Sequence, residues 1–129
     1  MKKIKNFFKI GFYSANIILI TLYLFPGSIF GCFLYDNCYI QPQITRDFII
    51  STNHFYAFVL LTGLGIFSFH NTKKINLLIA YLFSLSIILE LFHIIISFRG
   101  FEMSDLFGNI VGVILAILIY KIVIRYVKT

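Results

Sequence analysis

Residues 90–116, ELFHIIISFRGFEMSDLFGNIVGVILA, join two long apolar runs through a short polar link. They hold three of the five acidic residues of the chain, and Glu90 and His93 lie inside the first apolar run. The second run begins with polar or small residues at spacings of three and four, which share one face of a helix: Asp105, Gly108, Asn109, Gly112 and Ala116. Ionisable groups inside membrane-length apolar helices are costly and usually face a partner or a cavity. The stretch therefore predicts packed helices around a polar site.

The composition indicates an integral membrane protein. Of the 129 residues, 60% are hydrophobic and 12% are charged, and the mean hydropathy is +0.93. A soluble domain of this length has too much surface to hide so many apolar side chains. The net charge of +6 does not indicate a nucleic-acid partner, because the basic residues lie at the ends of apolar runs and not in a patch interleaved with polar residues.

Four apolar runs predict an all-α, integral-membrane four-helix bundle that forms a single domain over residues 1–129. The predicted spans cover about residues 10–25, 52–69, 75–98 and 104–120. A hydrocarbon core of about 30 Å needs roughly 20 apolar residues, so the first span is short. Pro26 and Gly27 end it, since Pro removes a donor and Gly favours a turn. No small-x-small cleavage site follows, so we expect this span to be retained.

The basic residues are distributed unevenly between the two sides of the predicted bundle. When the spans alternate in direction, nine of the eleven Lys and Arg residues fall on the side of the N-terminus: Lys2, Lys3, Lys5, Lys9, Lys73, Lys74, Lys121, Arg125 and Lys128. Only Arg46 and Arg99 fall on the opposite side. Cytoplasmic flanks of membrane helices are enriched in Lys and Arg. We therefore predict that both termini are cytoplasmic.

Residues 26–51 form one long loop, apolar enough in part to favour the membrane surface. Residues 46–50, RDFII, are predicted to form a short interfacial helix that leads into the second span. Cys32 and Cys38 have a C-x5-C spacing. If the loop lies outside the cytoplasm a disulfide is permitted, but the spacing leaves open whether it forms. A metal site from two cysteines alone is not favoured, because structural zinc takes four ligands.

Helical spacing brings the polar residues of the last two spans to one level. At 1.5 Å per residue, Glu90 lies about 12 Å below the outer end of the third span, and Asn109 about 6 Å below Asp105. The third span has four polar residues on one face: Ser86, Glu90, His93 and Ser97. His54 begins the second span at the same level. We predict a cluster that opens toward the outer leaflet and contains His54, Glu90, His93, Arg99, Asp105 and Asn109.

Each member of this cluster also has a purely structural interpretation. Glu90 can be protonated by burial and simply hydrogen-bonded, with His93 as its partner three residues on. Arg99 and Asp105 can form an interfacial ion pair at the turn. The G-x-x-x-G of residues 108–112 usually means close helix packing. Six polar groups are more than four short helices need for packing, and this favours a binding site.

These residues resemble the pattern of the VanZ-like family of small bacterial membrane proteins. In that pattern a His and aromatic residues open a span, and a Glu is followed by a polar residue three further on and then by an Arg. An Asp, an Asn four later and a Gly three after that complete it. Within about residues 50–120 the matching positions are His54, Phe55, Glu90, His93, Arg99, Asp105, Asn109 and Gly112. The family also has an Asp just before the His. The chain departs from the pattern at that position, four residues before His54, where it has Ile50, and at His93, where Gln is common.

The resemblance implies a multi-pass protein of the bacterial cytoplasmic (inner) membrane that acts in the cell envelope. The name-giving member of the family is associated with resistance to the glycopeptide antibiotic teicoplanin. We therefore hypothesise that the cluster binds a membrane lipid or a lipid-linked glycan precursor. Arg99 would hold a phosphate, and Asp105 and Asn109 would orient sugar or amide groups. A homo-oligomer or an envelope-protein partner is left open.

Whether the protein is an enzyme is also left open. In the alternative hypothesis, Glu90 acts as general acid or base on an envelope lipid or glycan, with His54 or His93 as its partner. Four residues have side chains that suit zinc or manganese: His54, Glu90, His93 and Asp105. Because no ligand motif such as H-E-x-x-H occurs, we expect no metal and no cofactor. A channel or transporter subunit is disfavoured, since no polar residues lie deep on the cytoplasmic side.

Overall fold

The computed structural model describes residues 2–127, which form five α-helices and no β-strand. The helices are α1 (Lys2–Leu24), α2 (Ile29–Tyr35), α3 (Thr52–Phe69), α4 (Ile75–Phe92) and α5 (Met103–Val127). Four of them, α1, α3, α4 and α5, are long and apolar enough to cross a membrane. The prediction of an all-α fold with four membrane-length helices is therefore confirmed, and these helices indicate a multi-pass membrane protein. Lys128 and the side chain of Lys2, both assigned above to basic flanks, lie outside the described part.

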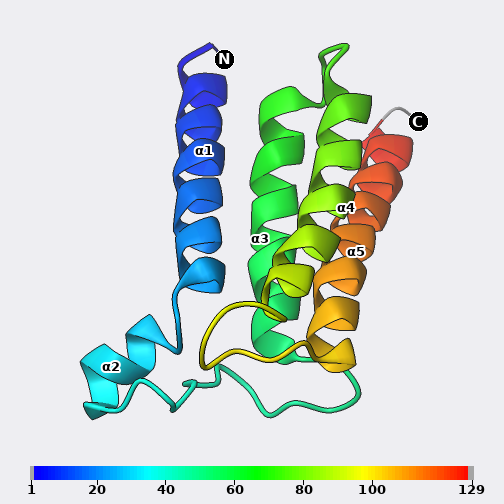
Figure 1. The fold of residues 1–129 in the computed structure, drawn as a ribbon. Coiled ribbons are helices and arrows are strands. Elements are labelled where there is room, and N and C mark those ends of the chain that lie inside the picture. Colours follow the sequence, from blue (N-terminus) through cyan, green and yellow to red (C-terminus); the bar gives the residue numbers. More distant parts are fainter. Residues whose placement is uncertain (1, 128–129) are drawn as a thin grey trace.

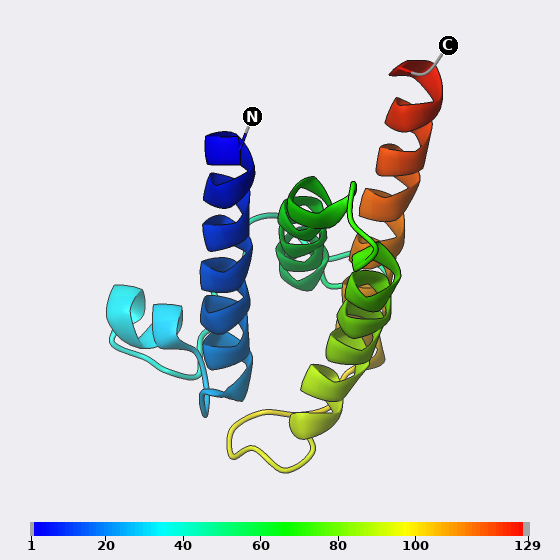
Figure 2. The same cartoon turned by 90° about the horizontal axis from the view of Figure 1, so that it is seen from above.

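The four long helices form a bundle in which α1 begins and α5 ends at the same end (Figure 1). We call this end, with the turn at residues 70–74, the terminus end. The opposite end is built from α2, residues 36–51 and residues 93–102, and we call it the site end. The central helix is α3, which contacts α1, α4 and α5 (Figure 2). The most extensive contact joins α3 and α5.

The bundle has an apolar interior and an apolar exterior. Phe58, Leu82 and Val113, from three different helices, are completely buried at its centre. On the outside, Ile17 and Leu77 expose 67% and 70% of their surface. Such side chains are costly in water and favourable against lipid tails. This pattern is the one expected of helices surrounded by a bilayer.

Small residues bring α5 unusually close to α3. A Cβ added to Gly108 would lie 2.6 Å from the Ser51 carbonyl oxygen, and one added to Gly112 would lie 2.6 Å from that of Phe55. Only a glycine permits this separation, because any side chain would push the two backbones apart. The interpretation of the G-x-x-x-G as a packing motif is therefore confirmed, with α3 as its partner.

Two helices extend beyond the predicted spans. The first begins at Lys2 and not near residue 10, and the last runs to Val127 and not to residue 120. The predicted spans ended where the apolar runs meet basic residues. Lys and Arg have high helix propensity, so the helices continue through these flanks.

The predicted third span was too long, because α4 ends at Phe92 and not at residue 98. Residues 94–96 are three consecutive isoleucines, and β-branched side chains are restricted in a helix. Backbone hydrogen bonds there join residues three apart, such as Ile94 N–H to Leu91 O at 3.1 Å, which makes tighter turns than an α-helix. Ser97 therefore does not continue the helical face of Ser86 and Glu90, and Glu90 lies in the last turn of α4.

The interfacial helix predicted for residues 46–50 is wrong, because this segment has no helical structure. Asp47 explains the difference. Its Oδ1 accepts hydrogen bonds from the backbone N–H and the hydroxyl of Thr52, at 2.8 and 3.0 Å. The side chain thus satisfies one of the free N–H groups at the start of α3, as capping residues do. The short helix of the loop is α2 instead.

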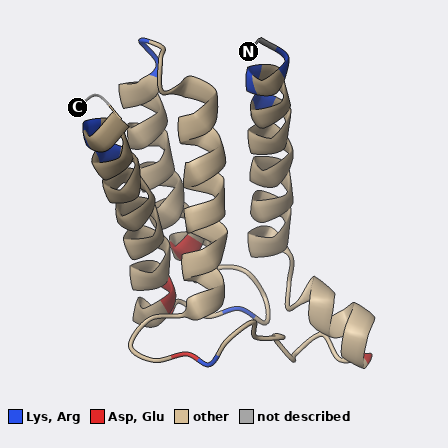
Figure 3. Ribbon diagram, turned by 180° about the vertical axis from the view of Figure 1, so that it is seen from behind, with Lys and Arg blue, Asp and Glu red and all other residues tan. Residues whose placement is uncertain are grey.

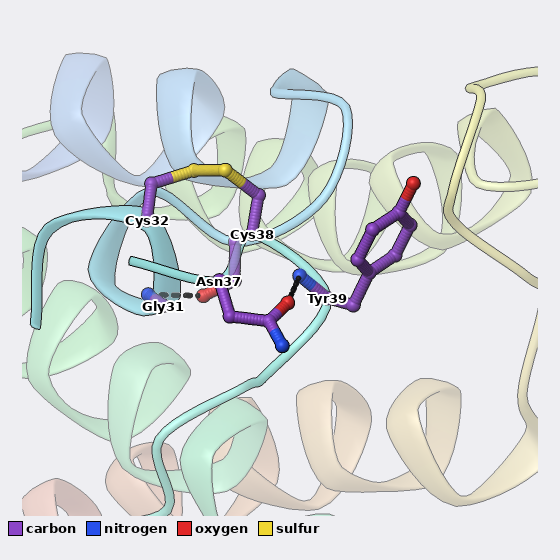
Figure 4. Close-up of a disulfide and its surroundings, with 6 residues drawn as sticks. Gly31, Cys32, Asn37, Cys38 and Tyr39 are labelled. Carbon is purple, nitrogen blue, oxygen red and sulfur yellow. Dashed lines mark hydrogen bonds between the residues drawn. A yellow bond between two sulfur atoms is a disulfide. The ribbon is translucent and has the colours of Figure 1, made fainter. Parts of the chain in front are cut away.

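The cysteines of the loop form a disulfide between Cys32 in α2 and Cys38 just beyond it. Figure 4 shows the bridge beside Asn37, whose side chain accepts a hydrogen bond from the Tyr39 N–H at 3.0 Å. Ser28 begins α2 by accepting a hydrogen bond from the Gly31 N–H. The disulfide, which the spacing left open, closes α2 and its following turn into one compact unit at the site end.

Candidate functional site

Polar side chains from all four membrane-length helices meet at the site end. We call this group the polar cluster: Tyr23 from α1, His54 from α3, Glu90 from α4, His93 directly after α4, and Asp105 and Asn109 from α5. Five of the six expose less than a tenth of their surface, and the side chain of Asp105 exposes 18%. Five of the six residues predicted for the site are therefore brought together, and Tyr23 joins them.

Asn109 links three helices at the centre of the cluster. Its Nδ2 donates to the Ser86 carbonyl oxygen at 3.0 Å, which fixes the orientation of the amide. Its Oδ1 then faces Tyr23 and His54, at 2.5 Å from the Tyr23 hydroxyl and 3.2 Å from His54 Nδ1. The close packing at Gly108 places this amide against α3, because the residue next to Asn109 is the one in backbone contact.

His54 lies between two carboxylates. Its Nε2 is 3.5 Å from Asp105 Oδ2, and its Nδ1 is 3.9 Å from Glu90 Oε2 and 2.8 Å from the Tyr23 hydroxyl. His54, Glu90 and Asp105 each offer a ligand atom, and these three atoms lie within 4.8 Å of one another. Of the described residues, these three form the group whose donors are close enough to share a metal ion.

The segment that follows α4 covers Glu90. Its Oε1 accepts a hydrogen bond from the Glu102 N–H at 3.1 Å. Its Oε2 is completely buried, has no hydrogen-bond partner, and lies 3.3 Å from His93 Nδ1. The prediction that Glu90 lies about 12 Å inside the third span is wrong, because the helix ends two residues after it. The site is therefore shallow and closed by residues 93–102.

Arg99 does not pair with the carboxylates of the polar cluster. Its Nη2 and Nε donate to the carbonyl oxygens of Leu22 and Phe25 at 2.8 and 3.3 Å, and its Nη1 donates to Gln41 Oε1 at 3.2 Å. A cation is favourable at a helix C-terminus, where carbonyl groups lack partners. The Arg99–Asp105 ion pair left open by the sequence is not found within residues 2–127.

Arg99 nevertheless remains part of the site wall. Burial lowers the pKa of its guanidinium, and the nearby Tyr23, Asp105 and Glu90 side chains act in the opposite direction. A guanidinium stays protonated at neutral pH despite such a shift. Arg99 therefore contributes a fixed positive charge next to the buried polar groups.

A cavity of about 480 Å³ adjoins the polar cluster. It lies between α1, α2, residues 41–44 and the first half of α3. Tyr23, His54, His93 and Arg99 form part of its wall. Most of the remaining wall is apolar, including Leu19, Leu22, Ile29, Phe30, Leu34 and Leu60. The cavity thus combines a polar region at the cluster with apolar walls, which suits an amphipathic ligand.

Sequence reasoning missed Tyr23, Ser86 as a backbone acceptor, and Gln41. Tyr23 is one of eight tyrosines and stands near the end of an apolar run, where an aromatic residue is normally an interface anchor. One signal was available: if the first two spans are antiparallel, Tyr23 near the end of the first lies at the same depth in the bundle as His54 at the start of the second. The partners of Ser86 and Gln41 are distant in sequence, so no local pattern indicates them.

Comparison with known protein families, with curated proteins and with solved structures finds no match to this chain.

Proposed function

We propose that the protein is a VanZ-like multi-pass protein of the bacterial cytoplasmic membrane, with cytoplasmic termini and an outward-facing site end. The distribution of charge supports this orientation: Figure 3 shows Lys and Arg gathered at the terminus end, while Arg46 and Arg99 belong to the segments of the site end. The Cys32–Cys38 disulfide belongs to the site end, and disulfides persist outside the reducing cytoplasm.

The site binds a membrane lipid or a lipid-linked envelope component. The observation that carries this proposal is the cavity of about 480 Å³, which joins apolar walls to the polar cluster. An acyl or prenyl chain fits against the walls from α1, α2 and α3, while its head group reaches Tyr23, His54 and His93. Four of the residues that carry the VanZ-like resemblance, His54, Glu90, Asp105 and Asn109, lie together in the polar cluster beside this cavity, and this supports the proposal.

A phosphate in the head group would bind through Arg99. Two of its three donor groups are held by the carbonyl oxygens of Leu22 and Phe25 at the C-terminal end of α1. The third donates to Gln41, an exposed side chain that a ligand can displace. A charge-assisted hydrogen bond to phosphate is stronger than one to a neutral amide. The resemblance links such an envelope ligand to glycopeptide (teicoplanin) resistance.

Cysteine labelling tests the orientation. The two native cysteines are replaced by Ala, and a single Cys is placed at Gln43 in the site end or at Lys73 in the terminus end. In intact cells, a membrane-impermeant maleimide is expected to label Gln43→Cys, and to label Lys73→Cys only after lysis. The reverse pattern contradicts the proposed orientation.

Filling the cavity tests the lipid site. Ala57 lines the cavity, whereas Ala80 is an exposed residue of α4 outside it. We expect Ala57→Trp to weaken the binding of a polyprenyl phosphate by at least about tenfold, because its side chain would occupy the ligand volume. Ala80→Trp is expected to bind as the wild type does. Native mass spectrometry in micelles measures both, with diacyl phosphate and diacylglycerol as further probes of chain and phosphate. Equal binding by the two variants contradicts the proposal.

One observation favours the second candidate, an intramembrane enzyme. Glu90 Oε2 is buried, lacks a hydrogen-bond partner and lies beside His93 and His54, as a proton-transfer group would. Glu90→Gln keeps the size of the side chain and removes its acid-base chemistry. Teicoplanin susceptibility of a bacterial host supplies the assay. If Glu90→Gln abolishes the phenotype while lipid binding persists, the enzyme is supported; full activity excludes it.

A further inference from the structure

The carboxylate of Glu90 leaves an unpartnered atom inside the site. Its side chain is 0% exposed, and Oε2 has no hydrogen-bond partner, although Oε1 accepts from the Glu102 N–H. A buried polar atom without a partner is unfavourable by a few kcal/mol, so native proteins rarely leave one. This oxygen therefore needs either a proton shared with a neighbouring histidine, such as His93 at 3.3 Å, or a group that the protein chain does not supply.

The hydrogen bonds of Asn109 decide which nitrogen of His54 carries a proton. Because Asn109 Nδ2 donates to Ser86, its Oδ1 is an acceptor only, and both the Tyr23 hydroxyl and His54 Nδ1 lie within hydrogen-bond distance of it. Both therefore donate to Oδ1. In a neutral imidazole, Nε2 then presents a lone pair, and it faces Asp105 Oδ2 at 3.5 Å. Two lone pairs at this distance repel unless a proton or a metal ion lies between them.

The same conflict occurs at His93. Its Nε2 lies 3.0 Å from the Tyr23 carbonyl oxygen, which can only accept, so Nε2 carries the proton. In the neutral ring, Nδ1 then presents a lone pair to Glu90 Oε2 at 3.3 Å. Protons on the histidines or on the carboxyl groups would remove both conflicts. A metal ion held by His54, Glu90 and Asp105 would remove the conflict at His54 and would neutralise the Glu90 carboxylate that faces His93. These two explanations differ in a quantity that can be measured, the metal content.

The charge of the site favours the metal ion. Within residues 2–127, the carboxylates of Glu90 and Asp105 have only histidines as ion-pair partners. The guanidinium of Arg99, the nearest fixed positive charge of the site wall, donates to carbonyl groups and to Gln41 instead. Two carboxylates, one buried and one partly exposed, that have no Lys or Arg partner call for a compensating positive charge.

We propose that His54, Glu90 and Asp105 bind one divalent cation, zinc or manganese, between α3, α4 and α5. One imidazole nitrogen and two carboxylates suit these metals. Tyr23 and Asn109 hold the Nδ1–H of His54, as outer partners of metal-binding histidines do. Three protein ligands leave a coordination position for water or a ligand head group. This goes beyond lipid binding and does not depend on it.

The test uses the metal alone. Full-length protein in detergent is stripped with a chelator, titrated with Zn²⁺ or Mn²⁺, passed over a gel-filtration column and assayed for bound metal by mass spectrometry. We expect about one ion per chain. Asp105→Asn and Glu90→Gln are expected to lower the affinity by at least about tenfold, since each removes a ligand charge. His70→Gln, at the other end of α3, is the matched control and should bind as the wild type does.

A second readout separates metal binding from misfolding. Metal that binds only the folded state raises the Tm, so the wild type and His70→Gln should gain stability on adding the metal, while Asp105→Asn should not. Asp105 is partly exposed, so its amide variant is the one expected to fold. Wild-type protein that binds less than about a tenth of an ion per chain, or Asp105→Asn with wild-type affinity, overturns the proposal. Either outcome leaves the lipid-binding test unaffected.

Discussion

The helix α3 carries a histidine at each end, and the two differ in almost every contact. His70, at the terminus end, is partly exposed, and its Nδ1 lies 3.2 Å from the carbonyl oxygens of Ile66 and Phe67 in its own helix. His54, at the site end, is 6% exposed and contacts Tyr23, Glu90, Asp105 and Asn109 from the other three spanning helices. The hydrogen-bond acceptors near His70 are thus local, with the Tyr120 ring as a further neighbour, while the polar partners of His54 are all distant in sequence.

The difference comes from backbone packing and not from the histidines themselves. At the site end, Gly108 and Gly112 let α5 approach α3 closely, which places Asp105 and Asn109 beside His54. Near the middle of α3, Gly63 has no atom within 4 Å of its added Cβ, so no comparable approach occurs there. Close helix contact without a hydrophobic driving force depends on such small residues. The polar cluster is therefore a consequence of the α3–α5 contact.

The largest expected effect is the loss of that contact. Gly112→Ala should lower the free energy of unfolding by about 3 kcal/mol, because the new Cβ would lie 2.6 Å from the Phe55 carbonyl oxygen. Gly63→Ala is the matched control, and it should be neutral or stabilising by up to about 1 kcal/mol, since Ala is the better helix former. Denaturant titration in mixed micelles measures both values. Equal effects at the two positions would show that the close approach is absent.

The next effect concerns the amide at the centre of the cluster. Asn109→Ala should cost about 2 kcal/mol, because it leaves the Tyr23 hydroxyl, the His54 N–H and the Ser86 carbonyl without their partner. The same titration supplies the measurement. A cost below about 0.5 kcal/mol, the range of ordinary surface substitutions, would mean that these groups do not meet.

A smaller effect is expected for the hydroxyl that the sequence did not indicate. Tyr23→Phe removes the donor to Asn109 and the partner of His54 Nδ1, and should cost about 1 kcal/mol. Tyr13, also in α1, is 56% exposed, and Tyr13→Phe should change the free energy of unfolding by less than about 0.5 kcal/mol. If the Tyr13 variant loses as much stability as the Tyr23 variant, the hydroxyl of Tyr23 has no special role.

The smallest effect is expected for His70, the histidine at the terminus end. His70→Gln removes a partly exposed ring that lies near the Ile66 and Phe67 carbonyl oxygens and at the edge of the Tyr120 ring, so its cost should stay within about 0.5 kcal/mol. Thermal unfolding of the purified protein detects a larger loss as a shift of several degrees in the Tm. Such a loss would show that His70 is as important to the fold as His54.

The four spanning helices and most of the site could be predicted because their signals are local. Apolar runs identify the spans, and spacings of three and four place Asp105, Asn109 and Gly112 on one face. The end of α4 could not be predicted, since the isoleucines of residues 94–96 are as apolar as the helix before them. Contacts with other segments, such as the hydrogen bond from His93 to the Tyr23 carbonyl oxygen, help to stabilise that turn, and no local pattern indicates them.

The hydrogen-bond partners of Arg99 and the position of Tyr23 in the polar cluster could not be predicted from the sequence, for a related physical reason. Arg99 satisfies carbonyl groups at the end of α1, and a need for such partners cannot be seen in the residues around Arg99 itself. The donors of the proposed metal site come from three helices, so they form no motif like those in which ligands lie within one turn. Most residues of the site could therefore be predicted from the sequence, while the contacts between them could not.

The central claim, that side chains from separate helices converge beneath the site end, is tested most directly by a double-mutant cycle on Tyr23→Phe and Asn109→Ala. These residues lie on α1 and α5, which are distant in sequence, and they share one hydrogen bond. A direct contact predicts a coupling free energy of about 1 kcal/mol between the two substitutions. Effects that add to within about 0.3 kcal/mol would contradict the convergence.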